Sequence, residues 1–180
     1  MKKQAQRYSD HELIAGALKR DRHFQEMLYR KYADAMFTVA CNYSENDDEA
    51  ADILQESFIK VFKHLDKHDS NRSLGGWIRK IVVNTALENY RQKKRNLEIL
   101  KEYHLEEEYD SDQSFENVED SEIVRYVNQL PDKAKMVLKL FTLEGYAHQE
   151  IAEALNISVG TSKSQLNRAK QLIREMIATK

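Results

Sequence analysis

Long stretches of this chain repeat apolar residues at helical spacing and contain almost no residue that would interrupt a helix. Apolar side chains recur three or four positions apart, which places them on one face of an α-helix. The 180 residues include one proline and five glycines, so few positions favour tight turns. The pattern predicts an all-helical protein, and the length suffices for one helical domain of ordinary size or two small ones.

The stretch from 147 to 170 has the pattern of a helix-turn-helix. Its first predicted helix spans 148–155, and after a short turn Ser158 caps a second helix that runs to about Ala178. Within the stretch, the second helix carries cations and no acids. It also presents polar residues of the types that contact phosphates and base edges: Thr161, Ser162, Lys163, Gln165 and Arg168. Taken alone, the pattern fits a DNA-binding helix and an ordinary solvated basic face equally well.

Charge is distributed unevenly, although the net charge is only −2. Lys and Arg outnumber Asp and Glu by 18 to 14 in residues 1–95 and by 9 to 5 in residues 123–180. Residues 96–122, in contrast, hold 1 cation and 11 acids. This asymmetry predicts two nucleic-acid-facing modules joined by an acidic connector. Because residues 96–119 also lose apolar periodicity, we expect a flexible linker there.

In the first module, cap residues predict where the helices begin. Ser9 and Glu12 form a capping box, a second helix begins near Asp21, and Asn46 caps a third helix that reaches about Lys67. One face of the third helix is apolar and should pack inward, whereas the opposite face carries Asp52, Gln55, Glu56, Ile59 and Lys63. A polar face with an embedded apolar residue suits a docking surface, but spacing alone favours an ordinary solvated face.

A polar loop from Asp66 to Gly76 precedes a basic helix that is predicted to begin at Trp77. From Arg79 to Arg95 this helix holds six cations against the single acid Glu88. Cations near a helix C-terminus also suit the helix dipole, so a purely structural explanation exists. Their number, together with the aromatic residues Trp77 and Tyr90, nevertheless favours contact with nucleic acid.

The second module is expected to contain four helices. The first is short, with an apolar side formed by Ile123, Val124, Val127 and Leu130 facing inward, and Pro131 interrupts it. A helix from Asp132 to Glu144 follows, with Gly145 directly after its end. The helix-turn-helix completes the module.

Several classes of protein are excluded or disfavoured. No segment approaches ~18 consecutive apolar residues, no signal peptide is evident, and the single Cys41 cannot form an internal disulfide, so we expect a soluble cytoplasmic protein without membrane insertion. The six histidines are scattered, and the i, i+4 pair His64 and His68 has no evident further metal ligand. We therefore expect no metal, no cofactor and no catalytic residue.

Four segments, in chain order, resemble those of a bacterial RNA polymerase sigma factor of the small extracytoplasmic-function (ECF) group of the sigma-70 family. They are Asp48–Phe58, Trp77–Ala86, Leu130–Lys133 and Gly160–Leu166 with Arg168 and Ala169. The resemblance implies an all-α fold of two small helical domains joined by an acidic flexible linker. The domains it implies are a sigma region 2 type domain at 7–95, the linker at 96–119 and a sigma region 4 type helix-turn-helix domain at 120–180.

The resemblance also implies roles for individual residues. Those matching the face that binds the polymerase clamp are Asp52, Gln55, Glu56 and Ile59. Those matching contacts to the melted minus-ten element, including a pocket for a flipped base, are Asp69, Ser70, Asn71, Arg72, Ser73, Trp77, Lys80, Asn84 and Arg91. Those matching readers of the duplex minus-thirty-five element are Thr161, Ser162, Lys163, Gln165 and Arg168. The implied partners are core RNA polymerase and promoter DNA, with the free chain a monomer; metals and cofactors are not implied.

Two positions depart from this pattern. Ala147 stands where many helix-turn-helix sequences place a Ser or Thr cap, so a weaker helix start is expected. Gln165 stands where many members of the group have an arginine, which changes the base preference expected at that position.

Alternative functions stay open at this point. A helix-turn-helix regulator that acts without polymerase would bind duplex DNA alone, usually as a dimer with paired half-sites. An enzyme or metalloprotein would need a set of ligands that the scattered histidines do not supply. The promoter consensus and an anti-sigma partner are also left open by the sequence.

Overall fold

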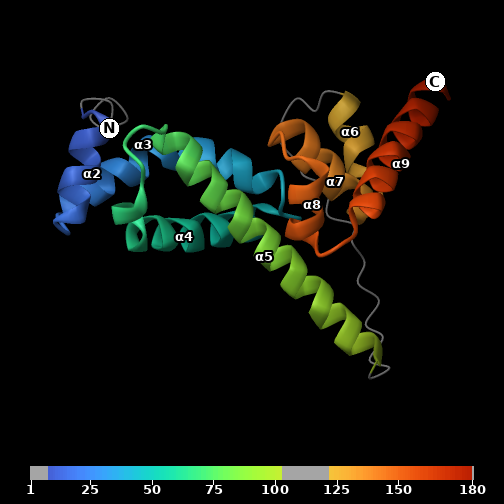
Figure 1. The fold of residues 1–180 in the computed structure, drawn as a ribbon, viewed down its shortest axis with the longest axis horizontal. Helices are drawn as coiled ribbons and strands as arrows, with labels where there is room; N and C mark the ends of the chain where they lie inside the picture. Colours follow the sequence, from blue (N-terminus) through green and yellow to red (C-terminus); the bar gives the residue numbers. More distant parts are fainter. Residues whose placement is uncertain (1–7, 103–121, 180) are drawn as a thin grey trace. The chain divides into compact units, whose positions relative to one another are not determined.

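The computed structural model in Figure 1 describes residues 8–102 and 122–179. Every regular element in these two ranges is a helix, which confirms the predicted all-helical fold class. The chain divides into two compact units, within Met1–Gln113 and Ser114–Lys180. Within the described ranges, none of the helices combines the length and apolar character needed to cross a membrane.

The first unit is a helical bundle built around α3. Its described elements are α2 (Asp10–Leu18), α3 (Arg22–Cys41), α4 (Asp47–Lys63), the short 3₁₀ helix η1 (Leu65–Lys67) and α5 (Leu74–Glu102). Helix α3 packs against α2, α4 and α5, and α4 packs against α5. Leu28, Ile53 and Ile78, from three different helices, are completely buried in the shared core.

The predicted caps start the helices of this unit. The Glu12 N–H donates to Ser9 Oγ at 3.3 Å while the Ser9 N–H donates to Glu12 Oε2 at 2.8 Å, so the capping box is confirmed. Asn46 Oδ1 accepts from the Glu49 N–H at 2.8 Å, and Asp21 caps α3. These side chains satisfy backbone donors that have no partner within the helix.

The loop between α4 and α5 is shorter than predicted. Helix α4 ends at Lys63 and is followed by η1, and α5 begins at Leu74 instead of Trp77. The Ser73 hydroxyl accepts from the Gly76 N–H at 3.3 Å, and Leu74 is buried. Two glycines at 75 and 76 suggested a loop, but they lie in a first helical turn, where a cap and a buried leucine outweigh their low helix propensity.

Helix α5 also ends later than predicted. It continues to Glu102, past position 96, where the linker was expected to begin. Residues 96–102 contain leucine, glutamate and lysine, which are strong helix formers, so loss of apolar periodicity did not mean loss of helix. Leu97 and Ile99 are exposed, because this end of α5 extends beyond the bundle (Figure 1). The remainder of the predicted linker, 103–119, lies within the undescribed residues 103–121, so an acidic linker there stays a prediction.

The second unit is assembled on the last helix. Its described helices are α6 (Glu122–Asn128), α7 (Asp132–Leu143), α8 (His148–Leu155) and α9 (Val159–Ala178). Helix α9 packs against α7, α8 and α6, and Leu140, Ile151 and Ala169 are completely buried. The expectation that Ile123 and Val124 face inward is wrong: they are 58% and 39% exposed. Helix α6 packs less extensively on α9 than α7 and α8 do, and this leaves Ile123 and Val124 largely open to solvent.

The helix-turn-helix has the predicted bounds. Asn156 ends α8 in the left-handed conformation with φ 52°, which asparagine tolerates better than most residues. Ser158 Oγ accepts from the Thr161 N–H at 3.0 Å and so caps α9 as predicted. At Ala147, Glu150 Oε2 accepts from the backbone N–H at 2.8 Å. This bond supplies half of a capping box and offsets part of the missing side-chain cap.

Candidate nucleic-acid and protein interfaces

Asp52, Gln55, Glu56 and Ile59 lie together on α4, and we call these residues the α4 face. Asp52 and Gln55 are exposed, and Ile59 is 68% exposed, which is unusual for so large an apolar side chain in a core-forming helix. The inward side of α4 includes Phe58, whose ring meets Tyr29 of α3 edge-on at 4.7 Å between centroids. The predicted separation of a polar face from an apolar core face is therefore present in α4.

Lys60 links the α4 face to α5. Its Nζ lies 2.9 Å from Glu56 Oε1 and 2.7 Å from Glu88 Oε2, and it donates to Thr85 Oγ1 at 3.2 Å. Burial acts to lower the pKa of Lys60, but the hydrogen bonds that Lys60 donates to Glu88 and Glu56 outweigh it and raise the pKa. Lys60 therefore stays charged and holds the Glu56 carboxylate in place on the α4 face.

Asp69 organises the loop from 69 to 73, which we call the 69–73 loop. Its Oδ1 accepts from the Asn71 N–H at 3.0 Å and from Asn71 Nδ2 at 3.1 Å. Its carbonyl accepts from the Arg72 N–H at 2.9 Å, and its other carboxylate oxygen lies 3.6 Å from Arg72 Nε. All residues of the loop are exposed. Asp69 thus shapes the turn, while Asn71 and Arg72 present polar groups to solvent.

Four of the predicted residues lie on α5 directly after this loop, and we call them the α5 stripe: Trp77, Lys80, Asn84 and Arg91. The Trp77 ring is half-buried and meets the His68 ring nearly perpendicularly at 5.4 Å. Lys80 and Asn84 are exposed, whereas Arg91 is half-buried and donates through Nε to the Leu87 carbonyl at 3.3 Å. A line of one aromatic ring, two cations and an amide suits a single strand with stacked bases and charged phosphates.

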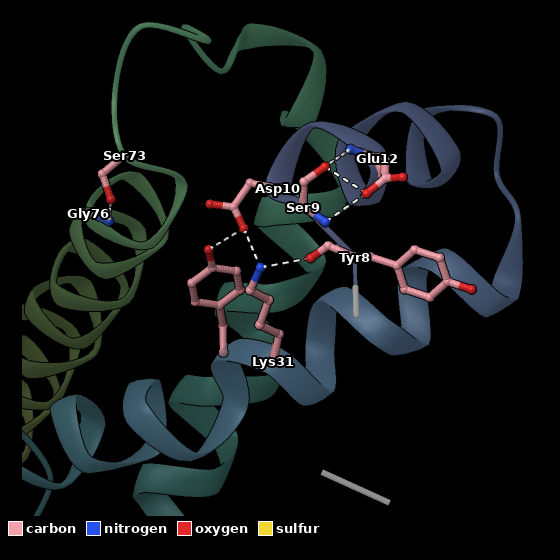
Figure 2. Close-up of polar contacts among 8 residues, drawn as sticks. Tyr8, Ser9, Asp10, Glu12, Lys31, Ser73 and Gly76 are labelled. Carbon is pink, nitrogen blue, oxygen red and sulfur yellow. Dashed lines mark hydrogen bonds and ion pairs between the residues drawn. The ribbon is translucent and has the colours of Figure 1, made fainter. Parts of the chain in front are cut away.

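A polar cluster between α2 and α3 supports the start of α5 (Figure 2). Asp10 Oδ1 accepts from Lys31 Nζ at 2.8 Å and from the Tyr32 hydroxyl at 2.7 Å. A side chain at Gly75 would place its Cβ only 3.1 Å from Tyr32 Cε1, so the Tyr32 ring lies directly against the first turn of α5. The sequence offered no signal for this contact, because it joins residues more than forty positions apart.

We expect the contribution of Asp10 to stability to depend on pH. Burial acts to raise the pKa of Asp10, but the hydrogen bonds from Lys31 and Tyr32 outweigh it, so the pKa lies below its usual value of 3.8. A depressed pKa in the folded state adds stability above the unfolded pKa, and that stability is lost as pH falls through the folded pKa. Asp10→Asn should therefore lower the urea midpoint at about pH 7, and the difference from wild type should shrink as the pH falls below 3.8. A difference that persists unchanged at the lower pH would contradict this assignment.

On α9, the candidate DNA-contacting residues occupy both sides of a buried stripe. At about 100° per residue, Thr161, Gln165 and Arg168 share one flank of the stripe. Lys163 lies on the other flank. If α9 lay in a groove of duplex DNA, Lys163 and Arg168 would therefore point toward opposite walls of that groove. Lys163 and Arg168 are exposed, and Thr161 and Gln165 are half-buried.

Ser162, which was predicted to contact DNA, does not lie on the outward surface of α9. Its side chain is completely buried and its Oγ lies 2.9 Å from His148 Nδ1 of α8. Ser162 shares the inward stripe with Leu166 and Ala169, at i+4 and i+7, both of which are buried. A polar residue type suggested an outward position, but helical phase places it in the core of the helix-turn-helix.

Ser164 and Asn167 were missed, although they lie near the middle of the outward surface of α9. Both are exposed, and Ser164 Oγ donates to the Thr161 carbonyl at 3.0 Å. Asn167 has an amide of the kind that recognises adenine by two hydrogen bonds. Placing every residue of α9 at about 100° per residue around the helix axis, starting from the buried stripe and ignoring residue type, would have identified both as outward-facing.

Comparison with known proteins places a family match on each unit. The family model described as Sigma-70 region 2 matches residues 28–96, and the model described as Sigma-70, region 4 matches residues 120–173. The first range contains the α4 face, the 69–73 loop and the stripe on α5. The second contains α8 and residues 159–173 of α9.

Curated proteins of the ECF group are similar to most of the chain. The ECF RNA polymerase sigma-E factor of Haemophilus influenzae is 29% identical over 188 residues, covering 96% of this chain and 97% of that protein. SigW of Bacillus subtilis is 27% identical, with coverage of 81% and 84%. SigE of Mycolicibacterium smegmatis is 28% identical over 84% of this chain, which spans only 60% of that longer protein.

Solved structures show the same fold. The sigma factor RpoE in complex with the anti-sigma factor NepR from Bartonella quintana has a TM-score of 0.52 at 18% identity, covering 85% of this chain and 96% of that chain. CnrH in complex with the cytosolic domain of CnrY has a TM-score of 0.50 at 19% identity, covering 94% and 97%.

Proposed function

This chain belongs to the ECF group of the sigma-70 family, whose members are promoter-specificity subunits. We propose that it binds core RNA polymerase through α4 and reads two promoter elements. The observation that carries the proposal is that each matched region exposes its own polar residue set: the α4 face and the 69–73 loop in the first unit, and the outward surface of α9 in the second. The domains would be those proposed from the sequence, with the first extended to the end of α5.

The α4 face is the proposed contact with the polymerase clamp. Its exposed isoleucine offers an apolar anchor, and the surrounding carboxylates and amide offer charge and hydrogen-bond specificity. Ile59 is 68% exposed, more than any other large apolar side chain among the described residues, and burial against a partner would remove this apolar surface from water. The Lys60 contacts keep Glu56 oriented before binding, which lowers the entropic cost of forming the interface.

The 69–73 loop and the α5 stripe are the proposed contacts with the melted minus-ten element. Turning a base out of a duplex costs a few kcal/mol, so the protein must supply stacking and hydrogen bonds in return. Trp77 offers the stacking surface, and Asn71 and Arg72 offer the polar groups beside it. Lys80 and Arg91 would follow the phosphates, with Asn84 between them.

The outward surface of α9 is the proposed reader of the duplex minus-thirty-five element. A helix-turn-helix places its second helix in the major groove, and here that surface carries Lys163, Arg168, Thr161 and Gln165, to which we add Ser164 and Asn167. Gln165 in place of an arginine favours adenine over guanine at the base it faces.

The proposed partners follow from the same family. They are core RNA polymerase, promoter DNA and an anti-sigma factor, the last because the structurally similar RpoE is bound to one. The activity is binding, and no catalytic residue is assigned.

Gel filtration and footprinting would distinguish this function from that of a regulator acting without polymerase. We expect the full-length chain to elute as a monomer and to protect promoter DNA only when core polymerase is present. A dimer that protects paired half-sites by itself would support the stand-alone regulator and contradict the proposal.

Lys163→Ala is expected to weaken promoter binding by the chain in complex with polymerase and to make it less sensitive to salt. Each phosphate neutralised by a cation adds about 0.9 to the slope of log affinity against log salt concentration. Loss of one phosphate contact should therefore reduce the slope by about one. The measurement is promoter affinity by fluorescence anisotropy across a salt series, with Lys19→Ala as the matched control, because Lys19 is an exposed lysine directly after the end of α2. An unchanged slope for Lys163→Ala would exclude a phosphate contact.

A further inference from the structure

A partly buried hydrogen bond joins the two helices of the helix-turn-helix. His148 is the first residue of α8, and its Nδ1 lies 2.9 Å from Ser162 Oγ on α9. Ser162 has no exposed surface, whereas His148 is half-buried, so the Ser162 hydroxyl takes its partner from the protein. The bond therefore connects the start of the first helix to the first turns of the second.

The imidazole ring of His148 is also held from a third helix. It stacks on the Phe141 ring of α7 at 5.2 Å between centroids, with 25° between the planes. Lys170 Nζ of α9 lies 5.8 Å from the centroid of the same Phe141 ring, at the distance of a cation–π contact. The orientation of the ring nitrogen that meets Ser162 is thus set by α7 and α8 together.

The position of Ser162 gives this bond a consequence for DNA binding. Ser162 lies between Thr161 and Lys163 along α9, so a rotation of α9 about its axis that moved Ser162 would move both neighbours. The buried side chains of Leu166 and Ala169 hold one side of α9 against the other helices, but apolar contacts are non-directional and do not fix the rotation of α9. A hydrogen bond, in contrast, weakens steeply when its geometry changes.

We propose that His148 and Ser162 form a positioning pair that sets the rotation of α9 about its axis and thereby the register of its outward residues on duplex DNA. The inference rests on the proposed function, because it concerns the same DNA-reading surface. Neither residue touches DNA in this account; they act through Thr161, Lys163 and the residues that follow.

The test compares two replacements of His148 that differ in one property. His148→Phe keeps a flat ring for the stack on Phe141 but cannot bond to Ser162. His148→Asn loses the ring but places an amide atom near the position of Nδ1. Ser162→Ala removes the bond from the other side by deleting one oxygen. All variants are made in the full-length chain and assembled with core RNA polymerase.

The measured quantity is discrimination, the ratio of affinities for a promoter fragment with its minus-thirty-five element and one with that element scrambled. We expect His148→Phe and Ser162→Ala each to reduce discrimination at least about fivefold, the low end of the effect of losing one base contact when the outward residues of α9 shift. His148→Asn should restore most of it. The double variant should be no worse than either single variant, because both remove the same interaction.

Each outcome decides something. Full discrimination by His148→Phe and Ser162→Ala, or failure of His148→Asn to exceed His148→Phe, would overturn the positioning pair. If His148→Phe does not fold, Ser162→Ala and His148→Asn still test the positioning pair. Additive losses of discrimination in the double variant would overturn it, because they would indicate that the two residues have independent structural roles. Absence of discrimination by the wild-type chain would contradict the proposed function itself and is thereby distinguished from failure of the inference.

Discussion

Replacing Glu56 by arginine is expected to lower the affinity of the chain for core RNA polymerase at least about tenfold, because it reverses a charge at the centre of the α4 face. The new cation would also lie beside Lys60, which now binds Glu56 at 2.9 Å. Stability should change little, because an exposed i, i+4 ion pair contributes only about 0.3–0.5 kcal/mol. The measurement is a titration of labelled chain with core polymerase in the absence of DNA.

Glu26→Arg is the matched control for this variant. Glu26 is an exposed acid on α3 that pairs with Arg30 at i+4, as Glu56 pairs with Lys60. Both variants therefore lose an ion pair and change the net charge by the same amount. We expect Glu26→Arg to bind polymerase with near wild-type affinity. Equal affinity of Glu56→Arg and wild type, or equal loss in both variants, would contradict the assignment of the interface to the α4 face.

Replacing Trp77 by alanine is expected to reduce initiation on a duplex promoter at least about tenfold. Stacking of a base on an aromatic side chain is worth about 1–3 kcal/mol, and this energy offsets the cost of opening the duplex. The half-buried ring also fixes the 69–73 loop through its contact with His68, so loss of the ring should loosen the loop. The measurement is run-off transcription from a linear duplex template.

A second template and a second variant test the reason for this loss. On a template whose minus-ten element is already unpaired, Trp77→Ala should lose much less activity, because the duplex no longer has to be opened. Trp77→Phe, which retains an aromatic face, should recover most of the activity on duplex DNA. Equal loss on both templates would show that Trp77 has no part in strand opening.

Local chemistry made the helix boundaries largely predictable. Ser9, Asp21, Asn46 and Ser158 were recognisable as caps because a short polar side chain before an apolar-periodic run has few other roles. Both ends of α5 were predicted wrongly, because the local sequence signals there were weak and other effects outweighed them. Glycine at 75 and 76 and acids after 96 are weak signals, and the packing of Leu74 and the helix propensity of residues 96–102 overrode them.

The candidate sites were predictable where residue type and helical phase agree. On α4 both indicate an outward surface, and the structure places Asp52, Gln55 and Ile59 there. On α9 they disagree at Ser162, whose polarity suggests solvent and whose phase places it inside. His148 supplies the partner that makes the buried hydroxyl tolerable. Local sequence patterns do not reveal a contact with a residue on another helix, such as the contact of the Tyr32 ring with Gly75.

Run-off transcription of genomic DNA by core RNA polymerase, with and without the purified chain, tests the central claim most directly. The proposed function predicts a discrete set of new transcript starts that appear only when the chain is added, each preceded by shared sequences near minus ten and minus thirty-five. A transcript pattern unchanged by the chain, at concentrations where it is bound to polymerase, would contradict the claim.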